Sequence, residues 1–416
     1  MNHIAQASFI LPCWVEIWKR AGCKKLFHGE RPICTFCFGF FAEVDFPNLA
    51  ENLVVKRQRC IRYIYNFMLK NILNTRSLAK TVLLAMGGMV YFLGYCVLGK
   101  PNVLVQQEDR LFLVPRGVGL GQVAKRLKQE RYIANATTFV WTAWLLRYRP
   151  ETTPGCYRLC SNGSNWKTIR LLRGAMQTPL KISFSAAENK TDLVAQLTQN
   201  IGVYKEAFEA LLNDANTVVS YGFIPENVLA LFIPDTYEVY WTISEKQLFL
   251  KMYTAYQRFW NSKRLKQASE MRLTPIQVSI LASMVQLETN HLSEAAVIAG
   301  VYVNRLQRNM RLESCPALRY ALQTKQAKVR NRVLWRDLQL DSPYNLYRQK
   351  GLPPGPITLP SVAMIDAVLH YAKHDYLFFS AREDFSGMHY FSRTHAEHVK
   401  QARKYRAALT RRKIMQ

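Results

Sequence analysis

One stretch of the chain is apolar without interruption, and it predicts a membrane-spanning helix. The 19 residues between Lys80 and Lys100, numbers 81–99, carry no charge. At about 1.5 Å per residue, a helix of that length just crosses a hydrocarbon layer of roughly 30 Å. The alternative is a buried core helix, but such a helix normally alternates apolar with polar residues, and this stretch barely does.

Basic residues gather on one side of the apolar stretch and predict its orientation. Seven Lys and Arg lie between positions 56 and 80, and no acid occurs from Asn52 to Gln107. Such an excess marks the cytoplasmic side, so we expect residues 1–80 in the cytoplasm and everything after Lys100 on the outer side of the membrane. Cleavage as a signal peptide is disfavoured, because the end of the apolar stretch has no A-x-A-like pattern. A lipoprotein cleavage site is disfavoured too, because it needs a small residue before its cysteine and Tyr95 precedes Cys96.

The segment before the predicted helix is rich in cysteine. Residues 1–67 hold five of the nine cysteines, with a single C-x-x-C pair at Cys34 and Cys37. A structural zinc site needs four well-spaced ligands, and this segment offers only one suitably spaced pair. We therefore expect no bound metal, and we expect no cofactor. The simpler alternative is a misassigned start codon, with translation beginning at Met68.

The pattern after the predicted helix indicates a small α+β module over residues 105–180. Its expected order is strand, helix, helix, strand and a further helix, at 110–116, 121–127, 136–146, 155–159 and 166–173. The Trp-rich stripe of the second helix is expected in the core rather than as a sugar platform.

Residues 181–416 predict a larger α+β domain. Helical patterns cover 190–200, 205–213, 244–260 and 395–410, and a hairpin is expected from 376–380 and 389–394. Ser244 with Gln247 three residues later fits a capping box. The proline- and glycine-rich loop at 351–357 is expected to be rigid and to wall a cleft.

The most informative pattern lies between Thr274 and Thr289. Thr274 fits a helix N-cap and Pro275 the first helical position, and a second helix is expected after a cap at Ser293. Apolar residues follow on one face at helical spacing, and Glu288 falls at the end of that face. Partial removal from water would raise the pKa of this carboxyl and suit it as a general acid. The alternative is a glutamate at a frayed, solvated helix end.

Several motifs in fixed order carry a resemblance to a known family. The matching segments are 234–237 (PDTY), 282–289 (ASMVQLET), 303–306 (VNRL), 310–312 (MRL), 342–345 (SPYN), 351–357 (GLPPGPI), 376–379 (YLFF) and 389–398 (HYFSRTHAEH). Together they resemble the endolytic murein transglycosylases of the MltG, or YceG-like, family. The anchor and small module match as well, the module resembling the family's LysM-like domain.

The resemblance implies non-hydrolytic cleavage of peptidoglycan strands between N-acetylmuramic acid and N-acetylglucosamine. It assigns the catalytic role to Glu288, which would serve first as acid and then as base, leaving a 1,6-anhydro ring. It further implies termination of nascent strands and peptidoglycan synthases as partners. Candidate substrate-binding residues are Gln286, Asn304, Arg305, Glu313, Tyr344 and Asn345. For Asn304, Arg305 and Tyr344, structural hydrogen bonding is the open alternative.

Two positions depart from the family pattern. Gln286 stands where members often have a second glutamate, and Cys315 stands where they usually have an aspartate. The second departure leaves open a glycan-binding scaffold whose activity has lapsed. The net charge of +27 would also allow a nucleic-acid binder, but the chain has no recognisable nucleic-acid-binding motif, so wall and membrane are the expected partners.

Overall fold

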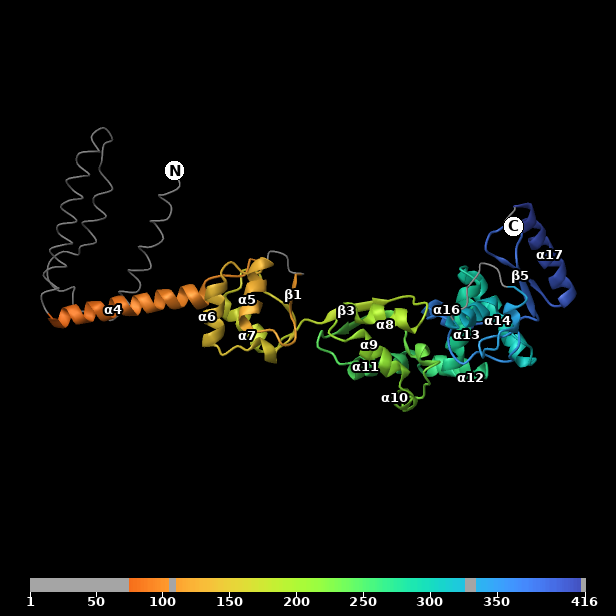
Figure 1. Ribbon diagram of the computed structural model, residues 1–416, viewed down its shortest axis with the longest axis horizontal. Helices are drawn as coiled ribbons and strands as arrows, with labels where there is room; N and C mark the ends of the chain where they lie inside the picture. Colours follow the sequence, from red (N-terminus) through yellow and green to blue (C-terminus); the bar gives the residue numbers. More distant parts are fainter. Residues whose placement is uncertain (1–74, 105–109, 326–333, 413–416) are drawn as a thin grey trace, which may run out of the picture. The chain divides into compact units, whose positions relative to one another are not determined.

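The computed structural model describes residues 75–104, 110–325 and 334–412 (Figure 1). The chain divides into two compact units between Phe92 and Leu93. Helix α4, Thr75–Gly94, leads into the π-helical turn η1, Tyr95–Gly99. The expectations about the cysteine pair and the start codon concern residues outside these ranges. Among the described helices, the one at 79–99 is long and apolar enough to cross a membrane, in agreement with the predicted stretch.

The first module is a strand–helix–helix–strand unit followed by a third helix, as the pattern predicts. It consists of β1 (Leu111–Val114), α5 (Leu120–Gln129), α6 (Ala136–Leu145), η2 (Pro150–Thr152), β2 (Gly155–Arg158) and α7 (Asn165–Arg173). The two strands pair antiparallel, with Phe112 opposite Tyr157. Both of these aromatic side chains are buried, whereas Trp141 and Trp144 are exposed. The expectation that the Trp-rich stripe lies in the core is therefore wrong.

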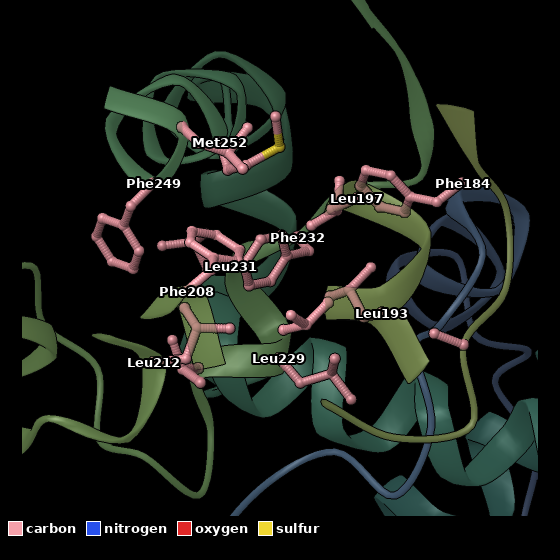
Figure 2. Packing of buried hydrophobic residues seen from close by; sticks show 14 of the residues in the cluster. Phe184, Leu193, Leu197, Phe208, Leu212, Leu229, Leu231, Phe232, Phe249 and Met252 are labelled. Atoms are coloured by element: carbon pink, nitrogen blue, oxygen red, sulfur yellow. The ribbon is translucent and has the colours of Figure 1, made fainter. Parts of the chain in front are cut away.

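A second hydrophobic cluster follows, around a two-stranded antiparallel sheet (Figure 2). Its elements are β3 (Leu180–Phe184), α8 (Lys190–Thr198), α9 (Lys205–Asn213), α10 (Ala215–Val219), η3 (Val228–Leu231), β4 (Asp235–Val239) and α11 (Glu245–Phe259). Helices α8, α9 and α11 match the predicted ranges, α10 was not predicted, and the capping box of Ser244 and Gln247 is confirmed. The pairing of β3 with β4 was not predicted, because each strand is short and the partners are far apart in sequence.

The third cluster is mainly helical and contains the candidate site. It is built from α12 (Ser262–Glu270), α13 (Pro275–Glu288), α14 (Leu292–Gln307), α15 (Cys315–Thr324), η4 (Asp337–Gln339) and α16 (Val362–Leu369). The predicted hairpin, β5 (Phe378–Ala381) and β6 (His389–Ser392), comes next and the chain continues as α17 (His395–Arg411). The described chain thus mixes helix and sheet, as expected.

Helix α13 lies at the centre of this third cluster. Its start is as predicted, with Thr274 as N-cap in a capping box and Pro275 in the first turn. The helix packs against α12, α14, α15 and α16, and all eight residues from Val278 to Val285 are buried. The single apolar stripe in the sequence therefore underestimates how much of the helix is buried, because two serines outside that stripe, Ser279 and Ser283, are buried as well.

The start of helix α14 differs from the prediction. Its N-cap is His291, whose side chain makes no capping hydrogen bond, and Ser293 already lies inside the helix. The connection from α13 consists of only three residues, 289–291, so the chain turns too soon for Ser293 to precede the helix. A cap motif in the sequence cannot show this, because the turn is set by the packing of α13 against α14.

Candidate functional site

Glu288 is the last residue of α13, and one oxygen of its carboxyl is held from two sides. Its Oε1 accepts a hydrogen bond of 2.7 Å from the Tyr302 hydroxyl and one of 3.1 Å from Ser314 Oγ. The side chain is half-buried rather than frayed into water. These contacts exclude the alternative of a solvated helix end.

The other carboxyl oxygen, Oε2, is available. It accepts no hydrogen bond from any residue that the structure describes, and it is not among the buried polar atoms left without a partner. Hydrogen-bond donors on Oε1 disfavour a proton there, since that oxygen is already accepting. The acidic proton of Glu288 therefore belongs on Oε2, the oxygen open to an incoming molecule.

The two donors come from different helices. Tyr302 lies on α14 and is 1% exposed, with its ring edge-on to Phe379 of β5 at 5.9 Å between centroids. Ser314 is the N-cap of α15, and it too is 1% exposed. Because both are packed tightly, their hydroxyls are preorganised toward Glu288.

The sequence reasoning missed both donors. Tyr302 directly precedes the Val-Asn-Arg motif at 303–305, and Ser314 directly precedes the departure at Cys315. Their nearness to these motifs was the only signal in the sequence. The spacing of 14 residues from Glu288 to Tyr302 becomes meaningful only when α14 folds back on α13.

Burial raises the pKa of the Glu288 carboxyl above its usual value. The hydrogen bonds from Tyr302 and Ser314 and the charge of His389 act in the opposite direction and are smaller. A carboxyl with a raised pKa keeps its proton closer to neutral pH, as a general acid must. No second carboxylate among the described residues contributes to this shift.

Cys315, the departure from the family pattern, also lies beside this carboxyl. Its side chain is exposed at the start of α15, and its Sγ is 2.9 Å from the Tyr347 hydroxyl. Burial is the main cause that raises the pKa of the Cys315 thiol above its usual value, so this side chain is neutral at neutral pH. The role of Glu288 as the acid stays a prediction.

Gln286 is two residues before the end of α13, and both ends of its amide are occupied. Its Nε2 donates to the Leu359 carbonyl over 2.9 Å, and its Oε1 accepts from the Ser361 amide over 2.7 Å. These bonds hold the segment that follows the proline- and glycine-rich loop against α13, and the rigidity of the loop itself stays a prediction. Substrate contact by Gln286 stays a prediction, and this geometry favours a structural role.

Arg305 and Asn304 serve the segment that leads into the hairpin. Asn304 Nδ2 donates to the His374 and Tyr376 carbonyls over 2.7 and 3.0 Å. Arg305 Nε donates to the Leu377 carbonyl over 2.6 Å, and its Nη1 lies 3.1 Å from Glu313 Oε2. These bonds favour the structural alternative for Asn304 and Arg305. The side chain of Glu313 is half-exposed although it pairs with Arg305, and substrate contact by Glu313 stays a prediction.

Tyr344 and Asn345 belong to the loop after η4. Asn345 Nδ2 donates to the Leu338 and Leu340 carbonyls over 2.9 and 2.7 Å, which closes that loop. Tyr344 is buried against Tyr320, with 4.8 Å between ring centroids. Neither side chain is shown touching Glu288, and substrate contact for both stays a prediction.

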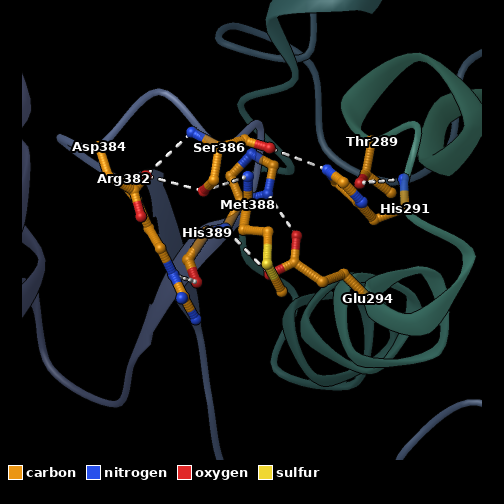
Figure 3. Close-up of polar contacts among 8 residues, drawn as sticks. All are labelled: Thr289, His291, Glu294, Arg382, Asp384, Ser386, Met388 and His389. Carbon is orange, nitrogen blue, oxygen red and sulfur yellow. Dashed lines mark hydrogen bonds and ion pairs between the residues drawn. The ribbon is translucent and has the colours of Figure 1, made fainter.

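The hairpin is attached to the α13–α14 corner by a buried acid–base pair (Figure 3). Glu294 Oε1 accepts from the His389 backbone amide over 2.9 Å, and Oε2 lies 3.0 Å from His389 Nδ1. Nearby, His291 Nε2 is 3.0 Å from the Ser386 carbonyl. The His291 side chain is otherwise exposed. The contacts of Glu294 fix the position of the His389 ring.

Comparison with known proteins agrees with the motifs around this site. The model of the YceG-like family matches residues 112–404, which is most of the described chain. The chain belongs to the YceG-like family.

Relatives within this family carry a functional name. An endolytic murein transglycosylase of Bacillus subtilis strain 168 is 28% identical over 313 residues, covering 70% of this chain and 83% of that protein. One from Streptococcus pneumoniae D39 is 26% identical over 316 residues, covering 68% and 56%. A crystal structure of a yceG-like protein from Listeria monocytogenes covers 70% of this chain and 98% of that one, with 24% identity and a TM-score of 0.44.

Within the described residues, no group of three or more His, Cys, Asp and Glu side chains could hold a metal ion.

Proposed function

We propose that this protein is an endolytic lytic transglycosylase that cleaves peptidoglycan strands between N-acetylmuramic acid and N-acetylglucosamine. The observation that carries the proposal is a carboxyl with a raised pKa whose Oε1 is held and whose Oε2 is free. Membership of the YceG-like family and the names of the relatives support it.

In the proposed reaction, Glu288 acts twice. Its Oε2 first gives a proton to the glycosidic oxygen as the bond to C1 of the muramic residue breaks. The resulting carboxylate then takes the proton from the C6 hydroxyl of the same residue. That hydroxyl oxygen closes onto C1 and forms the 1,6-anhydro ring, so no water is consumed. Hydrolases generally need two carboxylates, and one suffices here.

The Tyr302 and Ser314 hydroxyls assist both steps. While Glu288 is protonated they fix its orientation, and once it is a carboxylate they stabilise the charge on Oε1. Since the carboxylate exists only transiently, donors already in place cost no reorganisation when it forms.

The setting of this activity is also proposed. The apolar helix at 79–99 would anchor the protein in the inner membrane, with the basic N-terminal segment in the cytoplasm and the catalytic part in the periplasm. The first module, with its strand–helix–helix–strand order, would be LysM-like. Cleavage near the membrane would terminate nascent strands beside peptidoglycan synthases.

The test is mass spectrometry of glycan strands digested by the purified protein. We expect 1,6-anhydro ends from the wild type, and a loss of about 10²–10⁴-fold in the Glu288→Gln variant, since an amide cannot transfer the proton. Reducing ends instead of anhydro ends would contradict the lytic mechanism, and full activity of Glu288→Gln would contradict the role of this residue.

The exposed Cys315 beside Glu288 supports a second candidate, a glycan-binding scaffold whose activity has lapsed. Such a protein would bind purified sacculi and release no fragments. If the wild type is inactive, restoring the family pattern with Cys315→Asp should create activity. Release of glycan fragments by the wild type would contradict the scaffold hypothesis.

A further inference from the structure

We propose that the first module docks on the lipid bilayer through the exposed face of helix α6, formed by Trp141, Trp144 and Leu145. This inference rests on the proposed membrane anchoring and adds a second membrane contact to it. The three side chains are called the α6 face below.

The α6 face is an apolar surface that no described part of the chain covers. Trp141 is 60% exposed, Trp144 79% and Leu145 57%. Their spacing of three and four residues places them on one side of the helix. The opposite side, including Phe139 and Ala143, is completely buried. A surface helix normally carries mostly polar residues on its outer side, whereas on α6 the exposed Thr137 is followed there by two tryptophans and a leucine.

Partly buried hydrogen bonds join α6 and α7 to the last turn of the apolar helix. The carbonyl of Val97 in η1 accepts a hydrogen bond of 3.1 Å from Thr142 Oγ1 and another of 2.8 Å from Asn165 Nδ2. Asn102 Nδ2 in turn donates to Asn165 Oδ1 over 2.7 Å. The two donor side chains are buried, since Thr142 and Asn165 are 0% and 1% exposed, while Val97 itself is half-buried.

The attachment determines where the α6 face must lie. The apolar span ends at Gly99, and the Val97 carbonyl is two residues earlier. Polar groups that bond this carbonyl belong at the level where hydrocarbon gives way to head groups. Helix α6 supplies one of these polar groups, the Thr142 hydroxyl, so the exposed tryptophans of the same helix lie close to the membrane surface. Trp side chains are enriched at that depth, because the ring is apolar and its N–H is polar.

The charges around the α6 face suit a bilayer with anionic lipid. Residues 120–149 contain six Lys and Arg and one acid. Lys125 and Lys128 line a groove of about 630 Å³ between α5 and α6, and Trp141 borders the same groove. Basic side chains beside interfacial aromatics can bind lipid phosphates. An exposed tryptophan could also stack on a sugar, but that role would not explain the attachment to the membrane helix.

The experiment uses the full chain in vesicles of phosphatidylcholine and phosphatidylglycerol. Replacing the lipids by analogues brominated near the head group quenches tryptophans that enter the interface. We expect quenching in the wild type, and loss of most of it in the double variant Trp141→Ser/Trp144→Ser. The matched control is Trp335→Ser, because Trp335 is 79% exposed, like Trp144, but lies just before η4 and outside the first module. This control should keep the wild-type quenching.

Co-sedimentation with vesicles and release of anhydro ends separate the possible failures. Protein that co-sediments and releases anhydro ends, yet shows equal quenching in wild type and double variant, overturns the docking and leaves the proposed function intact. Protein that does not co-sediment overturns the anchoring and the docking together. A change in the emission of Trp141 and Trp144 on adding glycan strands, without bromolipid quenching, would assign the face to sugar and overturn the proposal.

Discussion

The hydroxyl of Tyr302 lies 2.7 Å from Oε1 of Glu288, across the corner between two consecutive helices. The contact joins the last residue of α13 to a side chain near the middle of α14. Together with the bond from Ser314 it occupies one carboxyl oxygen and leaves the other free. The pH dependence and the stability of the protein should both follow from this arrangement.

Removing the Tyr302 hydroxyl should shift the alkaline limb of the pH–rate profile upward. The hydrogen bond from Tyr302 lowers the pKa of Glu288 against the larger effect of burial. In Tyr302→Phe the pKa therefore rises further, and the acid form persists to higher pH. The plateau rate should fall by roughly tenfold, because about 1.4 kcal/mol of positioning is lost. Steady-state rates of anhydro-end release across pH measure both effects.

The control for this variant is Tyr237→Phe. Tyr237 is buried in the second cluster and donates to the Ile233 carbonyl over 2.6 Å, so the variant loses a comparable bond. It should lower stability without moving the alkaline limb. An alkaline limb that stays at the wild-type pH in Tyr302→Phe would contradict the role given to the Tyr302–Glu288 bond.

Glu288→Gln should be at least as stable as the wild type at neutral pH. The pKa of Glu288 is raised in the folded state, so the native carboxyl resists ionisation and stability is lost as pH rises above the unfolded value of about 4.3. Glutamine avoids this cost, and its Oε1 can still accept from both hydroxyls. We expect the melting temperature of the variant relative to wild type to increase from pH 4 to pH 8. A difference independent of pH would contradict the raised pKa.

Gln286→Glu, which restores the residue common in the family, should destabilise this protein. A carboxylate can accept from the Ser361 amide, but it has no hydrogen for the Leu359 carbonyl. The unpaired carbonyl costs about 1–3 kcal/mol. Protonation of the new carboxyl relieves the conflict, so the loss should be larger at pH 8 than at pH 5. Denaturant unfolding at both values measures it.

Gln277→Glu on the same helix is the matched control. Gln277 Oε1 accepts from the Thr274 amide as part of the capping box, and a glutamate performs that function equally well. Near the helix N-terminus its charge is also favourable, so stability should be unchanged or slightly higher. Equal effects of the two substitutions would show that the Leu359 contact is unimportant.

Arg305→Lys should lower the free energy of unfolding by about 2–3 kcal/mol. A lysine ammonium cannot reproduce the two hydrogen bonds that the guanidinium donates to the Leu377 and Leu312 carbonyls. Glu313→Gln is the comparison. The Glu313 side chain is 49% exposed, so its ion pair with Arg305 should contribute only about 0–1 kcal/mol. Unfolding free energies of the two variants decide between carbonyl bonding and ion pairing as the main role of Arg305.

Gly355→Ala should disrupt the contact between the proline- and glycine-rich loop and the segment before η3. A Cβ at position 355 would collide with the backbone carbonyl of Glu226, which cannot move aside like a flexible side chain. We expect a loss of about 1–3 kcal/mol or more. Gly121→Ala on α5 is the control, since its Cβ would meet open space and the helix should gain about 1 kcal/mol. Thermal unfolding compares them.

Local patterns predicted the elements that depend on neighbouring residues. The cap at Thr274, the capping box at Ser244 and the hairpin at 376–394 all rest on interactions within a few positions, and all agree with the structure. The burial of Glu288 was also predictable, because an apolar helical face shows which side of α13 meets the core. The pairing of β3 with β4 and the start of α14 were not, since both depend on distant packing.

The sequence by itself determined the apolar span and helices such as α5, α8 and α13, because hydrophobic spacing and capping are local properties. It also pointed to Glu288 as the proposed acid. Only the tertiary structure decided what the polar residues near that acid do. Several candidates for sugar binding, including Gln286, Asn304 and Arg305, have their donors occupied by backbone carbonyls. The hydroxyls that hold Glu288 come instead from Tyr302 and Ser314. A polar side chain is used by whichever partner the fold brings within about 3 Å, and that partner is a property of packing rather than of sequence order.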